Sequence, residues 1–192
     1  MRHWSHRLIE PLTSRHLVLV EGPSDRVMVK RVATLSGIDL DARGITIFEL
    51  EGSGLFKLAY DLFGPDGFGL PMSGLLDEDA RAEWADTIGV AEADLEVEGY
   101  IVCDPDLEGS YVEALGESTV IDMLLKSPGI TKNSLLKSCG VDEIDDISSQ
   151  ALADYCRHKK RKVRAAVSVA AGLTPEQAAK IVPIADLLAP LA

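Results

Sequence analysis

The sequence has no long apolar run and few cysteines. No stretch approaches the roughly 18 consecutive apolar residues of a membrane-spanning helix, and the N-terminal segment, with Arg2 and Arg7, lacks the apolar centre of a signal peptide. The three cysteines are widely spaced and form no Cys-x-x-Cys pair, which argues against a disulfide framework or a zinc ribbon. We therefore expect a cytoplasmic protein with no membrane partner.

Positive charge is also scarce. The chain has 19 Lys and Arg against 31 Asp and Glu, a net charge of −12 that opposes non-specific attraction to nucleic acid. The positive charge is concentrated, however, because seven of the eight positions in RHKKRKVR, residues 157–164, are Arg, Lys or His. This segment, called the basic run below, would attract a polyanion, although such a run can also be no more than a solvated helix face.

Strand and helix signals alternate four times in the first part of the chain. Hydrophobic residues make up 46% of the 192 residues, enough for one α/β domain with a helical appendage. Short apolar runs predict strands at 17–20, 45–50, 75–76 and 100–103, and helical patterns follow the first three at 25–37, 55–64 and 80–88. This alternation predicts a parallel sheet covered by helices on both faces, with right-handed crossovers.

Beyond Glu117 the strand signals disappear. Helices are predicted at 120–125, 148–156, 163–171 and 175–188. We therefore expect an N-terminal arm at 1–16, a catalytic core at 17–117 and a C-terminal helical segment at 118–192 that carries the basic run.

Carboxylates follow three of the four predicted strands. They are Glu21 after the first strand, Asp77 and Asp79 after the third, and Asp104, Asp106 and Glu108 after the fourth. The ends of parallel strands meet at one edge of the sheet, so these groups should converge, and converging carboxylates favour a hard divalent cation such as Mg²⁺. Each motif alone is more typical of an ordinary turn or helix start. Their joint placement favours a metal site.

Several of these segments resemble the Toprim domain of the OLD (overcoming lysogenization defect) nuclease family. The segment LVLVEGPSDR at 17–26 looks like the opening strand and turn of that domain, and LLDEDA at 75–80 resembles its Asp-x-Asp strand. Asp106-Leu107-Glu108 looks like its later glutamate motif, and ELEGSGLFKL at 49–58 resembles its Gly-rich segment. The resemblance extends over roughly 17–170 and implies a Toprim/Rossmann-like, mostly parallel sheet flanked by helices, with a C-terminal helical extension.

The resemblance also implies a metal-dependent endonuclease that cleaves phosphodiester bonds, with DNA as the expected substrate. Two ions per site, Mg²⁺ or Mn²⁺, would be held by Glu21, Asp25, Asp77, Asp79 and Glu108, with Glu21 also catalytic. OLD-type sites use a lysine from a later helix, for which Lys162 is the first choice and Lys159 the second. The expected nucleic-acid-binding residues are Arg157, Lys159, Lys160, Arg161 and Arg164.

The sequence departs from full-length OLD proteins because it has no ATPase module. It contains no GxxxxGK[ST] motif, and Gly52-Ser53-Gly54 lacks the Lys and Ser/Thr of a phosphate-binding loop. The sequence does not decide whether a separate ATPase acts as a partner or whether the chain oligomerises. A catalytically degenerate Toprim that binds or regulates without cutting is an alternative function. An aspartyl phosphatase is a weaker alternative, because its Asp-x-Asp follows the first strand and continues with Thr.

Overall fold

A computed structural model describes residues 9–52 and 55–192. The first eight residues of the predicted N-terminal arm, and Ser53 and Gly54 of the Gly-rich segment, lie outside the described residues. Among the described residues, no helix is both long and apolar enough to cross a bilayer.

The sheet has four parallel strands in the order β2-β1-β3-β4. They are β1 (His16–Val20), β2 (Ile45–Glu49), β3 (Met72–Asp77) and β4 (Tyr100–Cys103). The predicted parallel α/β sheet is therefore confirmed. Val20 is in register with both Glu49 and Leu75, and Asp77 with Cys103, so the carboxyl ends of the strands lie at a common edge.

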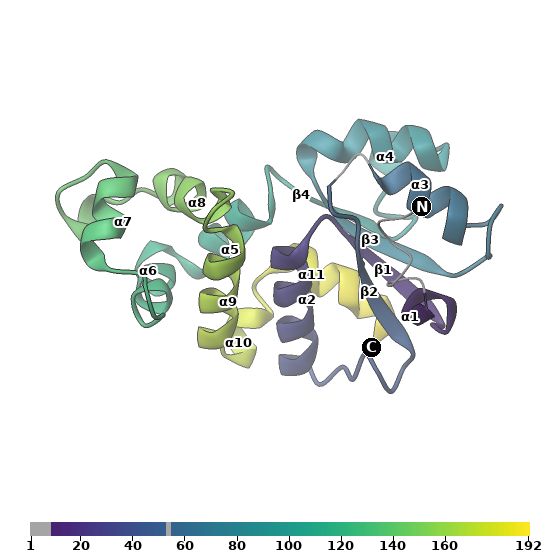
Figure 1. Cartoon of the computed structure of the whole chain (residues 1–192), viewed down its shortest axis with the longest axis horizontal. Coiled ribbons are helices and arrows are strands. Elements are labelled where there is room, and N and C mark those ends of the chain that lie inside the picture. The colour runs from purple at the N-terminus through teal and green to yellow at the C-terminus, as the bar shows by residue number, and fades with distance from the viewer. Residues whose placement is uncertain (1–8, 53–54) are drawn as a thin grey trace.

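Two separate cores cover the two faces of the sheet, because alternate residues of a strand point to opposite sides. Leu17 and Leu19 face an aromatic core under α3 (Phe56–Phe63) and α4 (Arg81–Ile88), where Phe56 and Trp84 stack with ring centroids 3.8 Å apart. Val18 and Val20 face the second, aliphatic core. This core packs under α2 (Pro23–Leu35) and the C-terminal helices, as Figure 1 shows.

The C-terminal helices extend to one side of the sheet and then return to it (Figure 1). Helix α9 lies along α2, whereas α6, α7 and α8 lie furthest from the strands. Helix α7 was not predicted from the sequence, because its eight residues are largely polar; Thr131 and Gly140 cap its two ends. These helices are α5 (Leu107–Leu115), α6 (Glu117–Leu125), α7 (Lys132–Cys139), α8 (Ser149–Arg157) and α9 (Lys162–Gly172).

The single helix predicted at 175–188 is wrong, because the structure has two helices there. Helix α10 (Pro175–Ala178) ends before α11 (Val182–Leu188) begins. Pro183 has no amide hydrogen and fits only the first turn of a helix, so a continuous helix through it would lose a backbone hydrogen bond. The remaining elements are short: α1 (Ile9–Leu12) and the 3-10 turns Glu78–Ala80, Glu92–Asp94, Ile144–Asp146 and Ala189–Leu191.

Candidate metal centre

The ends of the two central strands bring Glu21 and Asp77 together. Glu21 follows β1 directly, and Asp77 is the last residue of β3. The amide of Asp77 donates a hydrogen bond to Glu21 Oε1 (3.4 Å), and the amide of Leu107 donates one to Asp77 Oδ1 (3.3 Å). The backbone therefore orients both carboxylates at the sheet edge.

Asp25 is held over the first turn of α2. Its Oδ2 accepts a hydrogen bond from the amide of Gly22 (2.9 Å), and its Oδ1 accepts one from the hydroxyl of Ser24 (3.2 Å). Pro23 begins the helix at a position where its fixed φ and missing amide hydrogen are tolerated. The helix dipole stabilises a carboxylate here, which partly offsets the cost of burying Asp25.

Glu108 is the most deeply buried carboxylate of the group, with no exposed surface. Lys162 Nζ lies 3.4 Å from its Oε2, and no other described residue donates a hydrogen bond to either oxygen. Its helix, α5, is fixed by Asp106, whose Oδ1 accepts a hydrogen bond from the amide of Gly109 (2.7 Å). A buried carboxylate without hydrogen bonds is costly unless a cation compensates it.

Lys162, the first residue of α9, supplies a positive charge within this group. Its Nζ lies 3.4 Å from Glu108 Oε2 and 3.9 Å from Asp77 Oδ2. Burial lowers the pKa of Lys162, but the charges of Asp25, Glu108 and Asp77 outweigh burial and the net pKa is raised. The side chain therefore stays an ammonium ion, and its positive charge partly balances the carboxylates of Asp25, Asp77 and Glu108.

One ammonium ion does not neutralise the whole cluster. Burial raises the pKa of Asp77 to about 8, and the charge of Glu21 adds to this rise. Burial also raises the pKa of Glu108 to about 7, against the lowering effect of Lys162. The pKa values of Glu21 and Asp25 are raised as well, mainly by burial. Protons or added cations must balance these carboxylates, and oxygen ligands of this kind fit Mg²⁺ or Mn²⁺.

The carboxylates have the oxygen ligands that a divalent ion prefers, but their side chains are not arranged as a complete coordination site. Among the described residues, no three acidic, His or Cys side chains are arranged as a ready metal site. Glu21, Asp25, Asp77 and Glu108 could hold ions after small side-chain movements. Asp79, the fifth predicted ligand, is exposed in the turn after β3. Its charge raises the pKa of Glu21, but it makes no hydrogen bond or ion pair with another described residue.

Glu49 belongs to the same edge and was not predicted as a site residue. It ends β2, level with Val20, and its Oε1 pairs with Arg26 Nη1 at 3.1 Å. Its charge also contributes to the raised pKa of Asp25. The position of Glu49 as the last residue of a parallel strand was a signal available in the sequence.

The basic run divides into exposed and internally paired residues. Lys159 and Lys160, between α8 and α9, and Arg164 on α9 are exposed. Arg157 instead forms ion pairs with Asp106 (3.1 Å) and Asp154 (3.4 Å). Lys162 contacts the acidic cluster, whereas Lys159, the second choice for the catalytic lysine, is exposed and forms no ion pair with it.

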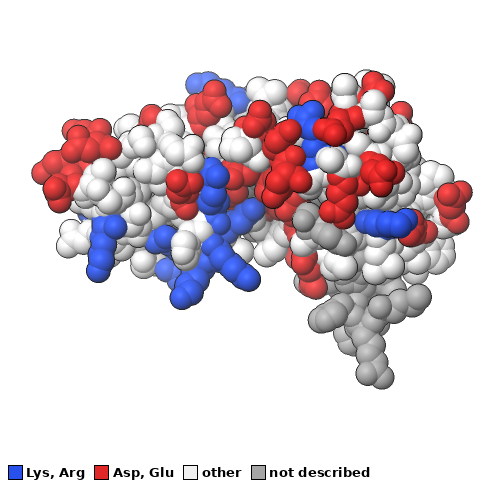
Figure 2. Space-filling model, turned by 90° about the horizontal axis from the view of Figure 1, so that it is seen from above, with Lys and Arg blue, Asp and Glu red and all other residues white. Residues whose placement is uncertain are grey.

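Arg161 is also engaged within the protein. Its Nη1 donates a hydrogen bond to Ser138 Oγ (2.7 Å), and its guanidinium lies 4.5 Å from the centre of the Tyr155 ring. Figure 2 shows Lys and Arg side chains gathered near the middle of the visible face, with Asp and Glu dominating the right-hand part and the far left end. A polyanion would therefore meet a local basic surface on an acidic protein.

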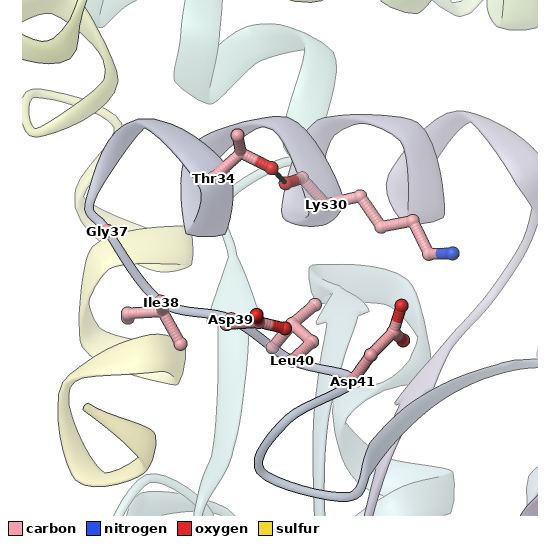
Figure 3. A pocket seen from close by; sticks show the side chains of 7 residues that line it. All are labelled: Lys30, Thr34, Gly37, Ile38, Asp39, Leu40 and Asp41. Carbon is pink, nitrogen blue, oxygen red and sulfur yellow. Dashed lines mark hydrogen bonds between the residues drawn. The ribbon is translucent and has the colours of Figure 1, made fainter.

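A hollow of about 390 Å³ lies at the other end of α2 from Asp25, next to Lys30 and Thr34 (Figure 3). Asp39 and Asp41 line its opposite side, on the loop that leads to β2. No predicted site residue lines it, so it is separate from the acidic cluster.

A protein-family model matches part of the chain. Residues 12–79 match the family model for the TOPRIM domain of overcoming lysogenization defect protein-like proteins. The matched segment contains Glu21, Asp25, Asp77 and Asp79 and ends before Glu108 and Lys162. No curated protein sequence matches the chain.

Solved structures of similar fold cover almost the whole chain. The C-terminal region of the Burkholderia pseudomallei OLD protein is 23% identical with a TM-score of 0.70, over 93% of this chain and 96% of that one. The C-terminal region of the Xanthomonas campestris pv. campestris OLD protein is 24% identical with a TM-score of 0.67, over the same shares. The resemblance to OLD-type Toprim domains expected from the sequence is confirmed at the level of the fold.

Proposed function

We propose that this chain is a divalent-metal-dependent nuclease that cleaves phosphodiester bonds, with DNA as its substrate. Two findings support the proposal: residues 12–79 match the OLD-like TOPRIM family model, and the fold is similar to that of the C-terminal region of OLD proteins. The observation that carries the proposal is the carboxyl edge of the sheet. There the fully buried Glu108 and Asp77 share one lysine as their counter-charge, and the pKa values of Glu21, Asp25, Asp77 and Glu108 are all raised. Clustered pKa shifts of this kind are typical of functional sites.

The carboxylates have distinct places in this proposal. Asp77 and Glu108 lie nearest Lys162 and would each supply an oxygen ligand to a cation. Asp25 and Glu21 would hold them from the α2 side, and Asp79 would complete the set from the exposed turn. Two bound ions would supply activation of the attacking water and stabilisation of the leaving oxygen.

Lys162 would stabilise the charge that develops on the phosphate. Its ammonium group is already held by two acidic neighbours, so it needs little reorganisation when the phosphate arrives. Glu21, with one oxygen hydrogen-bonded to the backbone of Asp77, would position the attacking water through its other oxygen. Lys159, Lys160 and Arg164 would bind the nucleic-acid backbone outside the reacting centre.

ATP hydrolysis has no residues in this chain to support it, because the sequence contains no GxxxxGK[ST] motif. We propose that any ATP-dependent control of cleavage comes from a separate ATPase or from a protein segment outside this sequence. A purely binding role is less favoured, because the acidic positions that chemistry needs are all present.

Cleavage of supercoiled plasmid and of single-stranded oligonucleotides tests the proposal. We expect cutting with Mg²⁺ or Mn²⁺ and none with a chelator, and we expect calorimetry to detect Mn²⁺ binding. Glu21→Gln should abolish cutting while binding to DNA stays nearly unchanged, whereas Glu83→Gln, an exposed position on α4, should cut normally. Undiminished cutting in the chelated buffer, or full activity of Glu21→Gln, would refute the proposed mechanism.

A further inference from the structure

A second cavity lies beside the acidic cluster, between α5 and α8. Its volume is about 310 Å³, at the lower end of the range for small-molecule sites. Exposed Pro105 supplies the main apolar surface, because Val112 and Ala153 are only 1% and 3% exposed, and Glu113 and Gln150 supply polar groups. None of these five residues has a place in the proposed chemistry.

The cavity is tied to the reacting centre by short connections. The carbonyl of Pro105 accepts a hydrogen bond from the amide of Glu78 (3.1 Å), next to Asp77. Asp106, the following residue, pairs with Arg157 at the cavity and caps the helix that carries Glu108. Glu108 is the third residue after Pro105, so their Cα atoms are at most about 11 Å apart.

The space is open because position 109 has no side chain. A Cβ on Gly109 would lie 3.2 Å from Pro105 Cδ and 3.3 Å from Asp106 Oδ1. Any larger residue would therefore push against the loop that supports Glu108.

The lining suits a nucleobase better than a phosphate. Arg157, the cation at the cavity, already forms ion pairs with Asp106 and Asp154, and the carboxylate of Glu113 would repel a phosphate. A base presents a flat apolar surface, which the exposed Pro105 can contact, and a polar edge. Carboxylates accept hydrogen bonds from exocyclic amino groups such as N4 of cytosine, and Gln amides bind base edges.

We propose that this cavity receives the base of the nucleotide next to the scissile phosphate, with Glu113 accepting a hydrogen bond from an exocyclic amino group. Gln150, whose Nε2 already donates a hydrogen bond to Asp154 Oδ1 (3.0 Å), would contact the same base edge through its Oε1. The inference rests on the proposed nuclease function and adds a base preference to it. Adenine, cytosine and guanine carry such an amino group, whereas thymine and uracil do not. Cutting should therefore be disfavoured where thymine occupies this position.

Sequencing the ends produced from a randomised oligonucleotide library tests the preference. The wild-type chain should disfavour thymine at one position beside the cut by about tenfold, the effect of roughly one hydrogen bond. Glu113→Ala should remove this preference with little change in kcat/KM on thymine-flanked substrates, and Gln150→Ala should weaken it. Glu83→Ala, which removes an exposed carboxylate on α4, should keep the wild-type preference.

A second measurement does not depend on cleavage. In NMR titrations, dCMP should shift the side-chain amide of Gln150 and the backbone amide of Gly109 more strongly than dTMP, and Glu113→Ala should remove the difference. Cutting without any base preference, or equal shifts with both nucleotides, overturns the base-binding cavity. Absence of cutting by the wild-type chain together with selective dCMP shifts would instead refute the nuclease proposal and keep the cavity.

Discussion

The acidic edge of the sheet and the basic run differ in how the protein holds their charges. At the edge, Asp25 and Glu108 are buried and each belongs to the first turn of a packed helix. In the basic run, Lys159 and Lys160 are exposed in a turn. The first arrangement keeps charges close at a cost in free energy, and the second leaves them in water at almost no cost.

Lys162 joins the two regions. It belongs to the basic run by sequence and to the acidic cluster by contact, because α9 begins at this residue and packs along α2. Arg31 near the other end of α2 donates hydrogen bonds to the carbonyls of Ala170 (2.9 Å) and Leu173 (3.2 Å). The two helices therefore run in the same direction, with their N-terminal ends at the site. Mutations at the acidic edge should therefore change the rate of cleavage, whereas mutations of the exposed residues in the basic run should change the affinity for DNA.

The largest expected effect is the loss of cleavage in Asp77→Ala. This residue lies between Glu21 and Lys162, and its removal should take a carboxylate ligand from the ions. Plasmid cleavage should fall below detection, whereas Asp86→Ala, an exposed position on α4, should cut normally. Without metal, Asp77→Ala should melt at a slightly higher temperature at pH values above about 8, where Asp77 is ionised and repels its acidic neighbours. If Asp77→Ala cuts at the wild-type rate, Asp77 has no part in the mechanism.

The next largest effect distinguishes two lysines of the basic run. Lys162→Ala should slow cleavage by roughly a hundred- to a thousandfold at saturating enzyme, because one preorganised charge is lost. Lys159→Ala should leave the rate at saturation nearly unchanged and affect only binding. Single-turnover kinetics with excess enzyme separates the two outcomes. Equal rates for Lys162→Ala and the wild type would make Lys162 part of the docking surface.

The acidic edge could largely be predicted from the sequence, and the reason is geometric. Residues that follow parallel strands must share one edge, so Glu21 and Asp77 were placed correctly beside one another without any knowledge of strand order. The strand order itself, β2-β1-β3-β4, depends on packing between distant segments and has no local signal. The sequence could place Glu49 at this edge, but its pairing with Arg26 had no local signal, because it requires α2 to lie against β2.

The basic run shows what composition cannot resolve. Arg157 and Arg161 look like Lys159 and Lys160 in the sequence, but they differ in what surrounds them. Arg157 contacts Asp106 from a segment about 50 residues earlier, and Arg161 contacts Ser138 from the unpredicted helix α7. Which cations are available to a ligand is therefore decided by tertiary contacts.

A smaller effect is expected when the exposed lysines are removed together. Lys159→Ala with Lys160→Ala should weaken DNA binding and lower the slope of log affinity against log salt by about two contacts. Arg157→Ala should instead lower the melting temperature, because it leaves Asp106 without its ion-pair partner. Fluorescence anisotropy at several salt concentrations and thermal melts measure both. An unchanged salt slope in the double variant would place the nucleic-acid surface elsewhere.

The smallest expected effect is a pH dependence of stability in the metal-free protein. Burial raises the pKa of Asp77 to about 8 and that of Glu108 to about 7, above the values of about 4 expected in the unfolded chain. Between these limits the folded state binds more protons than the unfolded state. The free energy of unfolding must therefore fall as pH rises from about 4 to about 8. Lys162 adds no slope in this window, because it is protonated in both states.

Thermal melts in chelated buffer at pH 5, 6, 7 and 8 measure this effect, and we expect the melting temperature to drop by several degrees over the series. Asp77→Asn should flatten the drop, since the amide does not titrate and keeps nearly the same size. Added Mn²⁺ should raise stability most at the upper end of the series, where the carboxylates are ionised and the ion no longer competes with protons. A melting temperature that rises with pH in the metal-free wild type would show that Asp77 and Glu108 do not bind extra protons in the folded state. The contrast between costly buried charges at the acidic edge and solvated charges in the basic run would then be wrong.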